Sequence, residues 1–131
     1  MNTPWGKAET IRNIADGIDF VSTDRHGGFV LSDARMAEMP LELRALSFSR
    51  DRFFEEDWAW AAVPLAFPDA FPPDHFAIAL KTYRDGIRHG YGAENAGWFG
   101  RIVDGLLVGP DHNGMIARLE AKLAEREVAN A

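Results

Sequence analysis

Three consecutive carboxylates, Glu55, Glu56 and Asp57, are the residues best placed to do chemistry in this chain. Large aromatic residues flank them on both sides, at 53–54 and at 58–60. Such a cluster can meet a metal cation or a basic protein surface. At the start of a helix, the same charges would stabilise the first turn through the macrodipole.

The apolar residues around the carboxylates have helical spacing, because one stripe of a helix would hold Phe54, Trp58 and Leu65. The pattern therefore predicts an amphipathic helix from about residue 53 toward residue 67. Pro64 lies inside this range and would kink the helix or end it near Val63. The carboxylates then either cap the helix or are presented to a partner.

The tripeptide His26-Gly27-Gly28 is the second candidate site. Two glycines let the backbone approach a ligand closely and leave the imidazole exposed at a turn. A hairpin turn beside a surface histidine is the plainer interpretation. His26 could supply a metal ligand together with Glu55 and Glu56, but only if the fold brings them together.

Other catalytic signatures are absent from the sequence. It contains no cysteine, no Gly-x-Ser-x-Gly and no glycine loop with phosphate-binding or dinucleotide-binding spacing. Two acid–histidine pairs, Asp74-His75 and Asp111-His112, precede apolar helical patterns and are predicted to be helix caps. We therefore expect no metal site and no cofactor, and favour a non-enzymatic protein.

The first thirty residues have the composition of strands. Segments 8–14, 18–23 and 29–31 are rich in β-branched and aromatic residues, and Asp16-Gly17 and Gly27-Gly28 provide turns between them. These features predict an antiparallel sheet of about three strands.

Helical patterns dominate the remainder of the chain. Ser32 is a natural N-cap for a short helix that Pro40 ends, and a further helical turn is expected at 41–46. A longer helix begins near Pro73 and is predicted to close at Asp85-Gly86, with a buried stripe at Phe76, Leu80, Tyr83 and Ile87. Segment 87–100 is a glycine-rich connector, 99–108 fits a helix better than a hairpin, and a last helix ends at about Val128. The whole predicts one α+β domain over 1–131, with three to four helices after the sheet.

Composition limits the partners. The 131 residues carry 20 acidic and 14 basic side chains, a formal net charge of −6. This balance argues against direct nucleic-acid binding, which needs a basic surface. The sequence shows no signal-peptide pattern and no apolar run long enough for a membrane span, so we expect a cytoplasmic protein.

The order of several short motifs resembles an uncharacterised family of small domains from bacteria and their plasmids and phages. The resemblance covers residues 3–68 and is carried by Thr3-Pro4-Trp5-Gly6, Val21-Ser22-Thr23, His26-Gly27-Gly28, Leu31-Ser32, Pro40, Leu43-Arg44 and Phe54-Glu55-Glu56-Asp57. The family often has a cysteine after the last aspartate, where this chain has Trp58. The resemblance implies a mobile-element setting and therefore the cytoplasm of a bacterial host cell. Small acidic proteins of this setting are often anti-CRISPR or antirestriction inhibitors.

These observations predict a binding protein that meets a basic surface of a CRISPR or other nucleic-acid-handling complex. The expected contact residues are Glu55, Glu56, Asp57, Trp58 and Trp98. The alternative is a small metal-dependent or hydrolytic enzyme that uses His26, Gly27 and Gly28 with the same carboxylates. The sequence does not decide the oligomeric state.

Overall fold

A four-stranded antiparallel sheet forms the N-terminal half of the fold. The computed structural model describes residues 1–48, 51–91, 101–104 and 106–129. The strands lie in the order β3 (Thr10–Ala15), β4 (Ile18–Ser22), β5 (Gly27–Leu31) and β6 (Phe53–Glu55). A small hairpin of β1 (Asn2–Thr3) and β2 (Gly6–Lys7) precedes them. The predicted three-strand meander is therefore confirmed, and β6 adds a fourth strand.

The β3–β4 turn lies at the predicted Asp16-Gly17. The predicted turn at Gly27-Gly28 is wrong, because these two glycines begin β5 and the β4–β5 turn spans residues 23–26. Gly17 has a φ of 77° in the β3–β4 turn, which favours glycine. Cross-strand pairing aligns Arg12 with Phe20 and Phe20 with Phe29, so these three side chains form one row on one face of the sheet. Val21 and Gly28 pair in the next row, on the opposite face.

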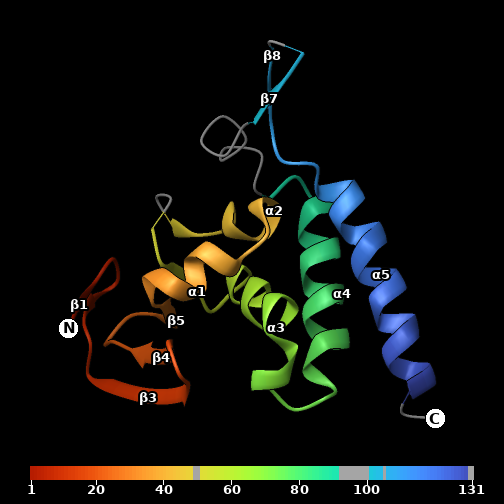
Figure 1. Ribbon diagram of the computed structural model, residues 1–131. Helices are drawn as coiled ribbons and strands as arrows, with labels where there is room; N and C mark the ends of the chain where they lie inside the picture. Colours follow the sequence, from red (N-terminus) through yellow and green to blue (C-terminus); the bar gives the residue numbers. More distant parts are fainter. Residues whose placement is uncertain (49–50, 92–100, 105, 130–131) are drawn as a thin grey trace.

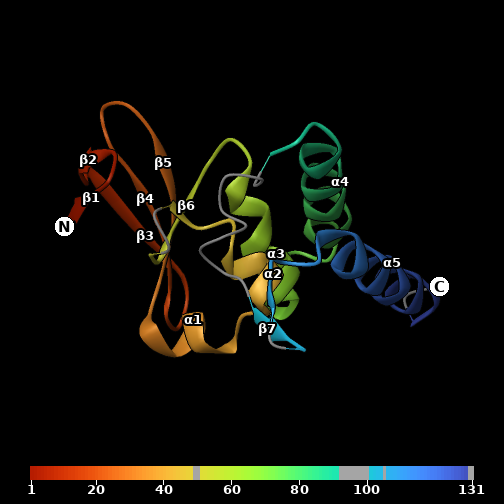
Figure 2. The ribbon, with the colours of Figure 1, turned by 90° about the horizontal axis from the view of Figure 1, so that it is seen from above.

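The segments between and after the last strands form short helices and turns. They are α1 (Asp33–Glu38), α2 (Leu41–Arg44), the 3₁₀ turn η2 (Ala59–Ala61), α3 (Ala62–Ala66) and the 3₁₀ turn η3 (Pro68–Ala70). Two longer helices, α4 (His75–Arg88) and α5 (His112–Ala129), follow. Figures 1 and 2 show the sheet at one side of the molecule, then α3, then α4 and α5. The α+β class is confirmed.

The hydrophobic core lies between the sheet and the helices. Its largest fully buried side chains come from both parts, including Ile18, Leu31, Phe54, Phe76 and Tyr83. Ser32 caps α1 through a side-chain bond to the N–H of Arg35, as its sequence position predicted. The described part of the chain contains no helix that is long and apolar enough to cross a membrane.

The predicted helix from residue 53 is wrong at its start. Phe53–Glu55 is the edge strand β6, and helical structure begins only at Ala59. Phe54 pairs with Phe29 of β5 and is fully buried, so pairing to the sheet overrides the helical spacing. Pro64 lies in the short helix α3, where the first helical turn tolerates its missing N–H.

Two further boundaries differ from the predictions. Gly86 does not close its helix, since α4 continues to Arg88. The predicted helix at 99–108 is wrong in its described part, because β7 (Arg101–Val103) pairs with β8 (Leu106–Val108) as a hairpin. Residues 99–100 and 105 lie outside the described residues. Asp104 has a φ of 50° at this turn, a conformation that aspartate tolerates better than most residues. The hairpin is the uppermost feature of Figure 1.

Candidate binding cleft

A cleft of about 420 Å³ opens between the sheet and the elements that follow it. Its floor is the row formed by Arg12, Phe20 and Phe29, extended along β3 by Ile14. Phe20 and Phe29 meet edge to face, with ring centroids 5.2 Å apart. The register of the meander therefore builds an apolar floor with a single cation, Arg12, on its outermost strand.

The opposite wall is formed by the segment from η2 to the start of α4. It contributes the side chains of Trp60, Pro64, Ala70, Phe71, Pro72 and His75. Phe71 ties the wall to the floor, because its ring lies 5.5 Å from that of Phe29 in an edge-to-face contact. A concave, mainly aromatic surface with few polar groups is typical of a binding site.

Glu56 is the anionic group of this cleft. Its backbone N–H donates to the Gly27 carbonyl at 2.9 Å, which fixes the residue directly after β6. A Cβ on Gly27 would lie 2.7 Å from Oε2 of Glu56, so the missing side chain leaves room for the carboxylate above the strand. Glu56 and Arg12 are both exposed, and neither forms an ion pair with the described residues.

Glu55 differs from its neighbours in the acidic trio. Its carboxylate accepts backbone N–H groups from Trp58 at 3.0 Å, Ala59 at 2.7 Å and Asp57. These bonds satisfy donors at the start of η2, which is the capping role foreseen for the trio as a whole. Asp57 is exposed, and its carboxylate forms no hydrogen bond or ion pair with the described part of the chain. Only Glu56 and Asp57 therefore present their charges outward.

Trp58 is part of the helical packing. Its indole N–H donates to the Thr82 carbonyl at 3.0 Å, and its ring lies across Gly86 and meets Tyr91 edge to face. The side chain is half-buried, so its contacts stabilise the junction between η2 and α4. Trp98, the other aromatic residue expected to contact a partner, lies outside the described residues.

The His26-Gly27-Gly28 segment forms the β4–β5 turn and the start of β5. The His26 carbonyl accepts from the Thr23 N–H and hydroxyl, at 2.9 and 2.7 Å. A Cβ on Gly28 would lie 2.2 Å from the Phe54 carbonyl oxygen and 2.7 Å from the Trp5 ring. Close strand packing thus accounts for Gly28, and His26 remains exposed. The backbone brings this segment beside Glu55 and Glu56, because Gly28 pairs with Glu55.

Among the described residues, no three His, Asp or Glu side chains gather closely enough to hold an ion.

The two predicted helix caps differ. The Asp111 carboxylate accepts a hydrogen bond from the Gly114 N–H at 2.9 Å, whereas Asp74 makes no side-chain capping bond.

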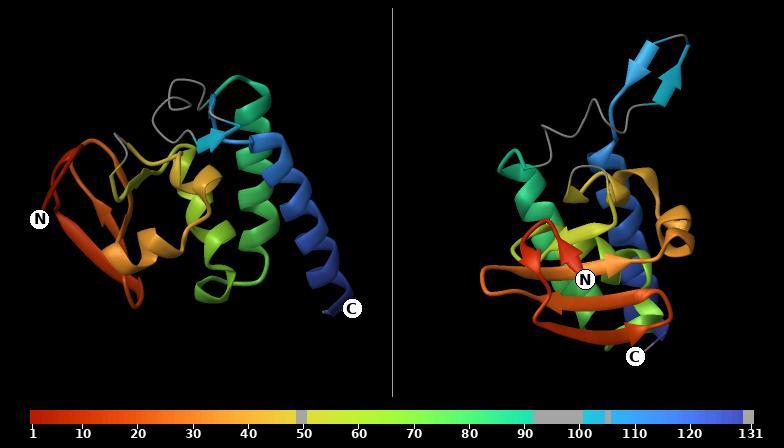
Figure 3. Two further views of the ribbon diagram at one scale, coloured as in Figure 1. Left: turned by 45° about the horizontal axis from the view of Figure 1, so that its top comes forward. Right: turned by 90° about the vertical axis from the view of Figure 1, so that its left-hand side faces the viewer.

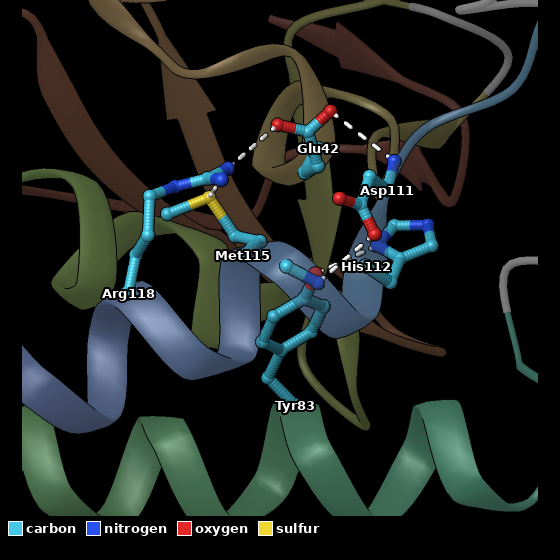
Figure 4. Close-up of polar contacts among 7 residues, drawn as sticks. Glu42, Tyr83, Asp111, His112, Met115 and Arg118 are labelled. Carbon is cyan, nitrogen blue, oxygen red and sulfur yellow. Dashed lines mark hydrogen bonds and ion pairs between the residues drawn. The ribbon is translucent and has the colours of Figure 1, made fainter.

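A second polar cluster joins α2, α4 and α5 (Figure 4). Glu42 is only 4% exposed. Its carboxylate accepts hydrogen bonds from the Arg118 guanidinium at 3.3 Å and from the Asp111 backbone N–H at 3.4 Å. Tyr83 and His112 share a hydrogen bond of 2.6 Å. Burial raises the pKa of Tyr83 and lowers the pKa of His112. Because Tyr83 is fully buried, no dissolved substrate reaches its hydroxyl, and the cluster anchors α5.

Of the residues that line the cleft, only Glu56 was proposed from the sequence as a contact residue. The lining comes from segments between residues 12 and 75 that only the fold brings together. The signal that could have been used is the β-strand alternation that places Arg12 and Ile14 on the same face as Phe20.

Comparison with known proteins places the chain in a family. It matches no curated protein and no solved structure. The family model described as a domain of unknown function (DUF7007) matches residues 1–106, which include the whole sheet, the cleft and α4. The match extends well beyond residues 3–68, which carry the motif order described above. The chain therefore belongs to the DUF7007 family.

Proposed function

We propose that this chain is a non-enzymatic binding protein that engages a basic protein surface and blocks it by occlusion. The observation that carries the proposal is the pairing of an aromatic cleft with outward carboxylates at Glu56 and Asp57. Apolar contact area beside charged groups is the usual composition of a protein interface, in which aromatic contacts supply affinity and charges supply specificity.

The partner's chemistry follows from the two carboxylates. A Lys or Arg side chain on the partner would meet Glu56 and Asp57 at the rim, while an apolar side chain enters the cleft. The net charge of −6 would also steer the protein toward a basic partner. A CRISPR or other nucleic-acid-handling complex offers such a surface, and an inhibitor of host defence is the concrete form of this proposal.

The test is a tagged pull-down from lysate of a CRISPR-bearing bacterium, analysed by mass spectrometry. The site variant is Glu56→Lys with Asp57→Lys, which leaves the capping residue Glu55 unchanged. The matched control is Glu125→Lys with Glu127→Lys, an equal charge change at exposed positions of α5. Thermal midpoints of all three proteins show whether each variant remains folded.

The proposal expects one nucleic-acid-handling complex to be recovered with the native protein and the control, and to be lost with the site variant. Equal recovery with a folded site variant would contradict a role for Glu56 and Asp57. Recovery of no such complex by the native protein would contradict the proposed partner class.

A further inference from the structure

The outer edge of β3 carries backbone groups that the described strands leave unpaired. β3 ends the four-stranded sheet, and β4 is its strand neighbour. In the right-hand view of Figure 3, β3 forms the lower edge of the sheet. An edge strand presents a row of N–H and C=O groups to any extended chain that approaches it.

The hydrogen-bond pattern identifies which β3 residues face outward. The Thr23 N–H bonds the His26 carbonyl, so β4 residues at odd positions turn their backbone groups toward β5. Ser22 and Phe20 then turn theirs toward β3, in agreement with the bond from the Glu9 N–H to the Ser22 carbonyl.

It follows that Thr10 and Arg12, the partners of Ser22 and Phe20, bond to β4. Ile11 and Asn13 alternate with these two residues along β3 and direct their N–H and C=O groups away from the sheet. The Ile11 side chain is also 53% exposed, although it is large and apolar. Neither Pro nor Lys protects this edge, and the register shift lies only at its end, between Asn13 and Ala15.

The cleft lies directly beside this edge. Arg12 and Ile14 of β3 belong to the cleft floor, so a strand added next to β3 would direct alternate side chains over the same cleft. Opposite charges in facing positions of neighbouring strands stabilise their pairing. Arg12 has no acidic partner among the described residues, so a carboxylate on the added strand would pair with its guanidinium.

We propose that the cleft and the β3 edge together bind an extended segment of the partner protein, which joins the sheet as a fifth strand. The segment carries a carboxylate beside Arg12 and, two residues away, a large apolar side chain beside Ile14 that enters the cleft. This inference rests on the proposed function and adds to it the conformation and sequence pattern of the bound segment.

The probe is a phage-displayed library of random peptides of about seven residues, which is enough for one strand. Selection on the immobilised native protein is expected to enrich Asp or Glu two positions from an aromatic or aliphatic residue. Selection on Arg12→Glu is expected to replace the acidic preference with Lys or Arg. No enrichment, or the same sequences from both proteins, would overturn the proposal.

Two variants at one position test the backbone pairing with a selected peptide. Ile11→Pro removes an outward N–H and leaves the β4 ladder intact, whereas Ile11→Ala removes the side chain and keeps the N–H. Loss of this hydrogen bond predicts roughly tenfold weaker binding to Ile11→Pro than to Ile11→Ala. Thermal unfolding shows whether both variants are folded. If Ile11→Pro is not folded, Asn13→Pro replaces it, with Asn13→Ala as the matched control.

Equal affinity for the proline and alanine variants would overturn strand addition. A native dimer in light scattering that Ile11→Pro dissociates would assign the edge to a second copy and would equally overturn the proposal. These outcomes are separable from failure of the proposed function, because the lysate experiment changes Glu56 and Asp57 and leaves β3 untouched.

Discussion

The indole of Trp58 lies across the backbone of Gly86, so close that a Cβ on Gly86 would be 1.8 Å from the indole nitrogen. This contact explains why a glycine stands inside α4, where it weakens an isolated helix. It also fixes the segment that follows Glu56 against α4. The acidic rim of the cleft is therefore connected to the packing of α4.

Gly86→Ala is expected to destabilise the protein by about 1–3 kcal/mol, because the added methyl group displaces Trp58. In a helix without this contact the same change would stabilise by about 1 kcal/mol. Urea unfolding of Gly86→Ala, Trp58→Ala and the double variant measures the coupling. If Gly86→Ala lowers the free energy of unfolding equally in the native protein and in Trp58→Ala, Trp58 is not the reason that a glycine stands at position 86.

Glu55→Gln is expected to lower the free energy of unfolding by about 1–2 kcal/mol, because the carboxylate accepts three backbone N–H groups. Glu56→Gln is the matched change at an exposed neighbour, and its effect is expected to stay within about 0.5 kcal/mol. Chemical denaturation of both variants makes the comparison. Equal effects would contradict the division of the trio into a capping residue and outward charges.

Acid is expected to weaken the anchoring of α5. Burial lowers the pKa of His112 below its ordinary value of 6.5, although the carboxylates of Glu42 and Asp111 oppose the shift. The unfolded chain then binds more protons than the folded one, so this contribution to stability is present above pH 6.5 and is lost as the pH falls through the folded-state pKa.

Unfolding free energies between about pH 5 and about pH 8 test this effect. His112→Asn keeps a side-chain acceptor for the Tyr83 hydroxyl and does not titrate, so its pH slope should be smaller than that of the native protein. An unchanged slope would exclude His112 as its source.

The sequence predicted those elements whose local signals agree with their packing. The β3–β4 hairpin followed from Asp16-Gly17, and α4 followed from its apolar spacing, with Phe76, Leu80 and Tyr83 buried. Both depend on residues close together along the chain. For this reason a single sequence was sufficient.

The predictions failed where contacts between residues far apart in the sequence determine the local structure. Phe54 has helical spacing with Trp58, but strand pairing to Phe29 holds it in β6. Gly86 resembles a helix end, and the distant Trp58 accounts for a glycine at this interior position of α4. The cleft was missed for the same reason, since its floor and wall come from elements far apart in the sequence.

The most direct test of the account is site-specific photocrosslinking of the partner. A benzophenone amino acid would replace Asp57, the residue that follows Glu56 of the cleft, in one protein and Glu125 on α5 in another, both exposed positions. After irradiation in the CRISPR-bearing lysate, mass spectrometry would identify any crosslinked protein. The account predicts that position 57 crosslinks to a subunit of the complex recovered in the pull-down and that position 125 does not. A crosslink to that subunit from position 125 alone, or equal crosslinks from both positions, would contradict the cleft as the binding surface.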